Sequence, residues 1–315
     1  MTTAAAEAPT GGRQGGMRTR SKVLIVVGLY LVLGLLFAIV LGSEGKNEEF
    51  KPQDEFKLDN WIPIHIGPID MSINKAVLYL FLGAALTIVT WVYIARRMHE
   101  RPNRVQTAVE TLYQLMKGNI AEGNMDRRMS TRWFTFVGTL FLFIWFSNLI
   151  GYLPLPTNTE HTVNVFGLEL PTFALYAATA NISVTLVLTL VVWFAYNLEG
   201  IRAHGFFGYL KSWVPAGVEG AAAVPIFVIE VISHFVRIIS LSVRSFANIL
   251  AGHLLILFMG GGLAVLLGVA ALGVFALPFA IIFFLFEVML IATLQAFIFA
   301  TLTAIYLGGA TAESH

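Results

Sequence analysis

The feature that most constrains this sequence is a series of long apolar runs that contain no Asp, Glu, Lys or Arg. A helix needs about 20 apolar residues to cross a hydrocarbon core of about 30 Å. Four uncharged runs reach that length, and a longer apolar tract follows them: residues 23–41, 76–95, 133–153, 173–198 and 224–307. The last tract is interrupted by three glycines at 260–262 and by Pro278, so it must hold at least two helices. The sequence therefore predicts an all-α fold, a polytopic membrane helical bundle.

Composition supports a bilayer as the main solvent of the chain. Hydrophobic residues make up 57% of the 315 residues and charged residues only 12%, too few to cover a soluble protein of this size. The net charge of +1 gives no reason to expect a nucleic-acid partner. Cysteine is absent, which excludes disulfides, thiolate metal sites and a cysteine nucleophile.

The distribution of basic residues predicts the topology. Basic side chains precede the first run and fill the segment between the second and third runs: Arg13, Arg18, Arg20 and Lys22, then Arg96, Arg97, Arg101, Arg104, Lys117, Arg127, Arg128 and Arg132. Residues 43–72 are net acidic, and residues 154–170 contain no Lys or Arg. Because short cytoplasmic loops are enriched in Lys and Arg, we expect the N-terminus and residues 96–132 on the cytoplasmic side and the other two connections outside.

We expect four regions along the chain. Residues 1–43 form a basic tail with an extra transmembrane helix, 44–72 an external loop, 73–308 the membrane domain and 309–315 a C-terminal tail. The first run also fits a cleaved signal peptide, since basic residues precede it and the small Gly42 follows it. We expect it to be retained as a helix.

A further helix is predicted within the basic segment. After Pro102, apolar residues recur at spacings of three and four: Val105, Ala108, Val109, Leu112, Met116 and Ile120. That period is typical of an amphipathic helix. It lies either on the membrane surface or against other protein, and the pattern does not separate the two.

The charges inside apolar sequence all fall in the last tract. They are Glu230, Arg237, Arg244 and Glu287, accompanied by His234 and His253. A charged side chain at mid-bilayer costs about 2.5–3.5 kcal/mol on insertion scales, so such residues normally mark ion paths. The structural alternative, Arg244 paired with Glu230, is poor because fourteen residues of helix separate them by ~21 Å.

Polar residues line one face of the helix that carries Arg244. Arg237, Ser240, Arg244 and Asn248 stand at spacings of three and four. Gln295 offers a second amide in an apolar segment, where it needs a hydrogen-bonding partner or serves as ordinary contact between helices.

Helix geometry predicts a second layer of polar residues. His253 lies nine residues after Arg244, and Glu287 lies eight residues before Gln295, rises of ~13 Å and ~12 Å. If the two helices are antiparallel and Gln295 is level with Arg244, then His253 and Glu287 are level with each other, toward the external face. Histidine has an unperturbed pKa of about 6.5, which suits proton relay.

At these residues the sequence resembles the a subunit of F-type ATP synthases. Residues 240–253 (SLSVRSFANILAGH) are similar to the family's most distinctive motif, and residues 294–299 (LQAFIF) with 306–307 (YL) match its C-terminal signature. Weaker matches are residues 148–154 (NLIGYLP) and 181–185 (NISVT). The resemblance covers residues 73–308 and implies two long, tilted C-terminal helices facing a ring of c subunits.

The resemblance also implies roles for single residues. Arg244 corresponds to the family's essential arginine, Gln295 to the glutamine beside it and Asn248 to its polar neighbour, and His253 matches the mitochondrial type. Ser240, Arg237 and Glu230 complete the expected proton path, with Glu287 as the acid near His253. The family's acid usually stands seven residues before the glutamine, whereas Glu287 stands eight before Gln295 and Val288 occupies the usual place.

The implied function is proton translocation through two half-channels at the interface with the c-ring, coupling the proton gradient to rotation and ATP synthesis. We expect no catalytic site, metal or cofactor in this chain, the c-ring and the b-subunit peripheral stalk as partners, and a bacterial-type cell membrane as its location. Two alternatives remain open. A secondary transporter would act without a ring and predicts an internal repeat with broken helices, and an intramembrane hydrolase needs a nucleophile and base or a metal site.

Overall fold

The structure is a computed structural model, and it describes residues 56, 58, 60–66, 69–70, 72–96, 98, 101–165, 168–214, 218, 222–262 and 270–311, with single positions between 24 and 36. Contacts divide the chain into two compact units. One contains Met1–Phe50 and Met259–Phe279, and the other contains Lys51–Phe258 and Ala280–His315. Most of the predicted first span, residues 23–41, lies outside the described residues. The site described below belongs entirely to the second unit.

Five helices in the described part of the chain are long and apolar enough to cross a membrane. They are α2 (Lys75–Arg96), α4 (Arg127–Gly151), α5 (Ile182–His204), α7 (Ala223–Leu257) and a final span, Ala276–Thr311, made of most of α9 (Ala270–Phe286), the π-helical turn η6 (Glu287–Ile291) and α10 (Ala292–Thr311). The predicted polytopic all-α membrane bundle is confirmed. Because α7 has 35 residues, it is ~52 Å long and must tilt within, or extend beyond, a ~30 Å core.

Capping residues set where two of these helices begin. Asp126 accepts a hydrogen bond from the backbone N–H of Met129, so α4 starts several residues before the apolar run at 133. Asn181 caps α5 in the same way, through Ser183. The apolar run beginning at 173 is therefore only partly helical, and its first residues belong to a strand.

Two short antiparallel hairpins stand in the connections predicted to be external. One pairs β1 (His65–Ile66) with β2 (Ile69–Asp70), and the other pairs β3 (Leu155–Val165) with β4 (Leu168–Ala174). The second hairpin is followed by the single 3-10 turn η3 (Ala178–Ala180), which leads into α5. From the sequence, both segments are predicted only as connections between helices.

The amphipathic segment folds as α3 (Arg104–Gln114) and the π-helical η2 (Leu115–Glu122). Its first turns expose Val105, while Met116 and Ile120 are fully buried. These two side chains join the main apolar core with residues of α4, α5, α7 and α10. Of the two alternatives left open, packing against protein holds for the second half of the segment.

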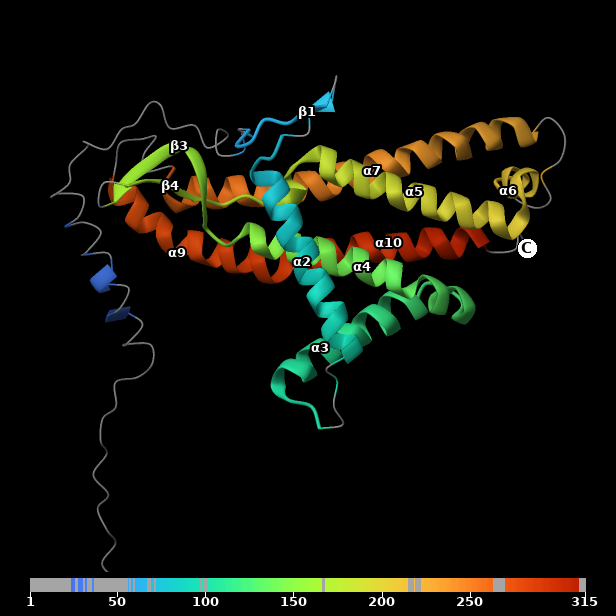
Figure 1. Cartoon of the computed structure of the whole chain (residues 1–315), viewed down its shortest axis with the longest axis horizontal. Coiled ribbons are helices and arrows are strands. Elements are labelled where there is room, and N and C mark those ends of the chain that lie inside the picture. Colours follow the sequence, from blue (N-terminus) through green and yellow to red (C-terminus); the bar gives the residue numbers. More distant parts are fainter. Residues whose placement is uncertain are drawn as a thin grey trace, which may run out of the picture. The chain divides into compact units, whose positions relative to one another are not determined.

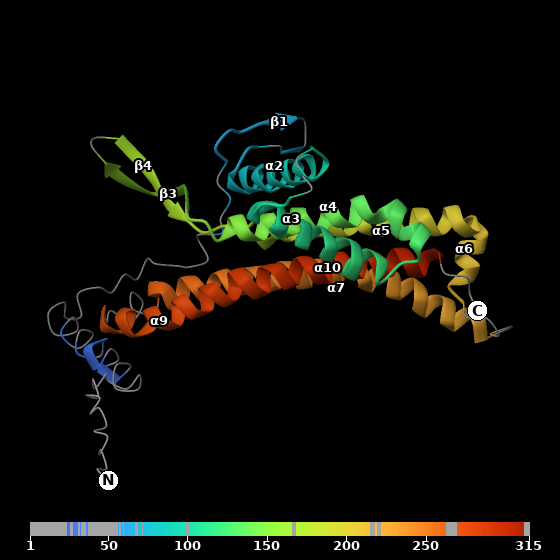
Figure 2. The ribbon, with the colours of Figure 1, turned by 90° about the horizontal axis from the view of Figure 1, so that it is seen from below.

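The helices of this unit are arranged in two layers (Figure 2). α4 and α5 lie over α10 and α7, α2 crosses α4, and the contacts join α4 to α10 and α5 to both α7 and α10. α7 and α10 run in opposite directions (Figure 1). At the end of the α4–α5 layer, Arg132 pairs with the buried Glu199 at 2.6 Å. The short α6 (Phe206–Ser212) then turns back across this end.

We expect Gly151 at the end of α4 to be required for stability. A Cβ there would lie 2.5 Å from the Cβ and 2.7 Å from the Cα of Ala177, atoms that cannot move without shifting the backbone. Gly151→Ala should therefore lower the free energy of unfolding by about 1–3 kcal/mol, measured as the thermal midpoint of the protein in detergent. The matched control is Gly118→Ala, because nothing lies within 4 Å of that position. Equal midpoints for the two variants would contradict the close approach.

Candidate proton-path site

Arg244 lies on an exposed apolar face of α7. Its guanidinium donates a hydrogen bond to Oγ of Ser240 at 3.3 Å, one turn earlier. Neighbouring exposed side chains on this helix are branched and apolar, including Ile239 at 60% and Val243 at 42% exposure. Within the part of the chain that the structure describes, Arg244 forms no ion pair, and Glu230 pairs with Arg237 instead. The cation is therefore presented outward with no carboxylate of this unit to neutralise it.

Gln295 meets Asn248 rather than Arg244. The Nδ2 of Asn248 donates to Oε1 of Gln295 at 2.9 Å, which joins α7 to α10 one turn beyond Arg244. Gln295 is 2% exposed, and its Nε2 has no hydrogen-bond partner among the described atoms. The expected register is thus shifted by one turn of helix.

His253 is fully buried and contacts two carbonyl groups. Its Nδ1 lies 3.0 Å from the backbone oxygen of Ile249, and its Nε2 lies 3.1 Å from the backbone oxygen of Gly151. A neutral imidazole has only one N–H and can donate to one of these oxygens, whereas an imidazolium can donate to both. A second proton on the ring would therefore have a carbonyl oxygen as its hydrogen-bond acceptor.

Glu287 reaches the same place through Tyr152. The hydroxyl of Tyr152 donates to Oε2 of Glu287 at 3.0 Å, and the Tyr152 ring stacks on the His253 ring with centroids 4.5 Å apart. Gly252 packs so closely that a Cβ there would overlap the Glu287 carboxylate. His253 and Glu287 therefore lie at one level, joined by Tyr152, with no direct hydrogen bond between them among the described contacts.

The turn η6 explains how Glu287 faces α7 despite its spacing from Gln295. Eight residues of regular α-helix would rotate the side chain by about 100° more than seven do. A π-helical turn bonds residue i to i+5 and so holds one extra residue per turn. Because Glu287–Ile291 is such a turn, eight residues here cover about the rotation of seven. The one-residue offset of Glu287 from the usual spacing is therefore compensated within this turn.

The remaining predicted residues form a second cluster nearer the start of α7. Arg237 donates to Glu230 at 2.9 Å, His234 lies 3.8 Å from the same carboxylate oxygen, and the guanidinium of Arg237 lies 5.4 Å from the centre of the Tyr306 ring. Two polar layers therefore occupy α7, on either side of Arg244.

A family model described as ATP synthase A chain matches residues 77–308. The chain belongs to this family. A Rubrobacter xylanophilus protein described as ATP synthase subunit a is 36% identical over 248 residues, which cover 78% of this chain and 87% of the relative. A Rhizobium rhizogenes protein of the same description is 35% identical over 262 residues, 82% of this chain and 96% of the relative. With its five apolar helices, this member of the ATP synthase A chain family is a multi-pass membrane protein.

Two contacts were not predicted from the sequence, that of Tyr152 with Glu287 and that of Tyr196 with His234. Tyr152 lies inside the weakly matching segment 148–154, which was noted without a role. In that segment, Asn148 donates to the backbone oxygen of Ala292 at 3.2 Å and accepts from Thr179 at 2.5 Å. The sequence feature that could have indicated these contacts is a tyrosine inside an apolar run, because a buried tyrosine hydroxyl needs a hydrogen-bonding partner.

Proposed function

We propose that this chain is the proton-conducting a subunit of an F-type ATP synthase, in which Arg244 faces a ring of c subunits and separates two aqueous half-channels. The observation that supports this most is Arg244 itself, exposed among Ile and Val side chains without a carboxylate of its own. An unneutralised guanidinium facing lipid is costly. A carboxylate presented by a neighbouring membrane subunit would remove that cost.

Electrostatics gives Arg244 its role in this mechanism. At ~4 Å and an effective dielectric constant of ~20, the attraction between the guanidinium and a carboxylate is about 4 kcal/mol. A protonated ring carboxylate that arrives at Arg244 therefore releases its proton, while carboxylates facing lipid stay neutral because burial disfavours the charged form. The same positive charge repels protons and keeps them from crossing between the half-channels without rotation of the ring.

The other residues of the site then divide by position. His253, Glu287 and Tyr152 carry protons in the external half-channel, and Glu230 with Arg237 lies in the cytoplasmic one. Ser240 bonds to Arg244, and Asn248 with Gln295 holds α7 against α10.

The remaining parts of the proposal follow the family. We assign the c-ring and the b-subunit stalk as partners, a bacterial-type cell membrane as location and the cytoplasmic side to both termini, with no catalytic site or cofactor in this chain. A secondary transporter is less well supported, because α7 continues unbroken from Ala223 to Leu257. A metal-dependent hydrolase is also less well supported, because the described residues contain no group of three His, Cys, Asp or Glu that could hold a metal ion.

Copurification tests the proposal directly. An affinity tag on this chain should recover, from detergent-solubilised membranes, a ring of small hairpin subunits together with ATPase activity. Inverted vesicles should then pump protons when ATP is added. Recovery of the chain alone, with substrate uptake by liposomes that contain only this protein, would support the transporter instead.

Gln295 is expected to support Arg244 without carrying protons, because an amide does not titrate. Gln295→Ala leaves the Asn248 amide without its acceptor and should lower ATP-driven pumping about five- to tenfold, the equivalent of one lost hydrogen bond of 1–1.5 kcal/mol. Gln295→Glu should impair pumping differently, through a competing ion pair with Arg244. The matched control is Thr303→Val, since the Thr303 hydroxyl bonds only to its own helix. Unchanged pumping by Gln295→Ala would reduce this residue to a packing role.

A further inference from the structure

The buried histidine of α7 that the proposed mechanism leaves unused is His234. It is 5% exposed and lies between two aromatic rings from other parts of the unit. Trp213, just after α6, stacks on it with ring centroids 4.2 Å apart, and Tyr196 of α5 lies at 5.6 Å on a tilted plane. An imidazole that only filled space here would need no polar partners, yet both of its nitrogens have one nearby.

The two ring nitrogens of His234 connect different environments. Nδ1 lies 2.8 Å from the hydroxyl of Tyr196, which is buried, while Nε2 lies 3.8 Å from Oε1 of Glu230. The Glu230 side chain is 31% exposed, so this carboxylate reaches the surface of the unit. His234 thus stands between a buried hydroxyl and a carboxylate that reaches the surface.

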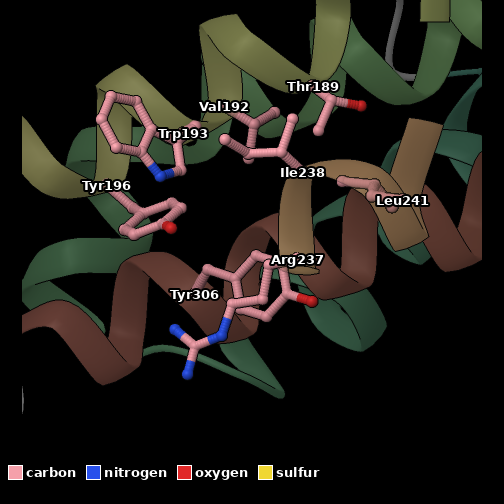
Figure 3. A pocket seen from close by; sticks show the side chains of 8 residues that line it. All are labelled: Thr189, Val192, Trp193, Tyr196, Arg237, Ile238, Leu241 and Tyr306. Carbon is pink, nitrogen blue, oxygen red and sulfur yellow. The ribbon is translucent and has the colours of Figure 1, made fainter. Parts of the chain in front are cut away.

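A small cavity lies beside Tyr196 (Figure 3). Its volume is about 10 Å³, which is close to the space needed for one water molecule. Residues of three helices line it: Thr189, Val192, Trp193 and Tyr196 of α5, Arg237, Ile238 and Leu241 of α7, and Tyr306 of α10. Leu241 is three residues from Arg244, a rise of ~4.5 Å. One wall of the cavity, Leu241, therefore lies about one helical turn from Arg244.

An unsatisfied donor points to water in this cavity. The indole Nε1 of Trp193 is buried and has no hydrogen-bond partner among the described atoms. A buried N–H without a partner costs about 1–3 kcal/mol, and a water molecule placed among polar groups removes that cost. Trp193, Tyr196 and Arg237 together offer the two to four polar contacts that a buried water needs.

We propose that one cavity water, Tyr196 and His234 form a proton-transfer chain that leads from the level of Arg244 to Glu230 and hence to the cytoplasmic solvent. This inference deepens the proposed function and rests on it. A cavity water that has accepted a proton released by the ring carboxylate at Arg244 passes a proton to the Tyr196 oxygen and returns to neutral water, as the Tyr196 hydroxyl proton moves to Nδ1 of His234. The proton on Nε2 then moves to Glu230, which releases it to solvent. The Tyr196 hydroxyl then turns back, and the imidazole of His234 returns to its starting tautomer. Each group thereby regains its initial charge.

The surrounding charges are compatible with this chain. The charged groups that face His234 in the described residues are Glu230 and Arg237, which pair with each other at 2.9 Å. Tyr306 faces Arg237, and Tyr209 of α6 donates to Asn197 at 3.0 Å. Burial raises the pKa of Tyr209 above its usual value, so this hydroxyl stays protonated and does not compete for the proton.

The test compares variants that keep the packing and remove the titrating atoms. His234→Phe keeps an aromatic ring against Trp213, His234→Gln keeps a hydrogen-bonding group, and Tyr196→Phe removes only a hydroxyl. In the complete complex in inverted vesicles, each variant should lower proton flux by at least about tenfold at pH 8. Positioned proton transfer contributes about 10²–10⁴-fold. We expect a smaller loss because water can partly replace the chain. The His234 variants should also change the dependence of flux on pH. The double variant Tyr196→Phe/His234→Gln should be no slower than the worse single variant, since both act in one chain.

A control separates this inference from the proposed function. Ser242→Ala removes a buried hydroxyl of α7 that bonds only to its own helix, and it should leave both flux and pH dependence unchanged. Arg244→Ala reports on the proposed function in the same vesicles. If Arg244→Ala stops pumping while the His234 and Tyr196 variants keep wild-type flux and pH dependence, the chain is refuted and the function stands. If Arg244→Ala pumps normally, the proposed function itself fails.

Discussion

Replacing Arg244 by alanine is expected to reduce ATP-driven proton pumping to background. The attraction of about 4 kcal/mol that favours the ionised ring carboxylate is then lost, and with it the barrier to direct proton leakage. Membranes stripped of the soluble ATPase should accordingly conduct protons passively. Fluorescence quenching in inverted vesicles measures both effects.

Arg244→Lys is expected to fail nearly as completely. Lysine keeps the charge, but its compact ammonium loses the proton more readily when buried and cannot present the planar fork of donors that guanidinium offers to a carboxylate. Arg128→Ala serves as the control, because it removes an exposed arginine at the start of α4. Normal pumping by either Arg244 variant would sink the proposed separation of half-channels.

The second large effect is expected at His253. His253→Ala should slow ATP synthesis by about 10²-fold, the lower end of what positioned proton transfer contributes, and shift its pH dependence. If His253 and Glu287 form one relay through Tyr152, their titration belongs to the pair and not to one residue. The exchange His253→Glu with Glu287→His should therefore recover more ATP synthesis than either single change.

Tyr152→Phe refines this experiment. It keeps the ring that stacks on His253 and removes the hydroxyl that binds Glu287, so we expect a smaller loss than for His253→Ala together with a shifted pH profile. Additive defects in the single variants, with no recovery in the exchange, would indicate that His253 and Glu287 serve separate paths.

The sequence predicted the membrane bundle well because its signal is chemical. Four uncharged runs and one longer tract define where helices cross a bilayer, whatever their contacts, and the charges of α7 stand out against them. Proton-path residues could be named for the same reason. Their roles remain predictions until the experiments above are done.

The contacts could not be predicted because they depend on distant segments and on local departures from a regular helix. Tyr152 reaches Glu287 only because α4 ends beside η6, and Tyr196 reaches His234 only because α5 packs on α7. Gln295 was expected level with Arg244, but it bonds to Asn248, one turn further along α7. The sequence of either helix alone does not determine the axial offset between the two helices. The β3–β4 hairpin was missed because residues 173–174 extend an apolar run that otherwise reads as helix.

The π-helical turn at Glu287–Ile291 has a consequence for how relatives of this chain are compared. In the proposed mechanism, the acid and Gln295 point to the same side of their helix. A helix achieves this with a spacing of seven residues in a regular coil, or of eight residues where one turn is widened. A residue-by-residue alignment assigns the position of the acid to Val288 and scores the carboxylate as absent. Counting turns instead of residues finds the carboxylate in its expected direction, against Gly252 and Tyr152.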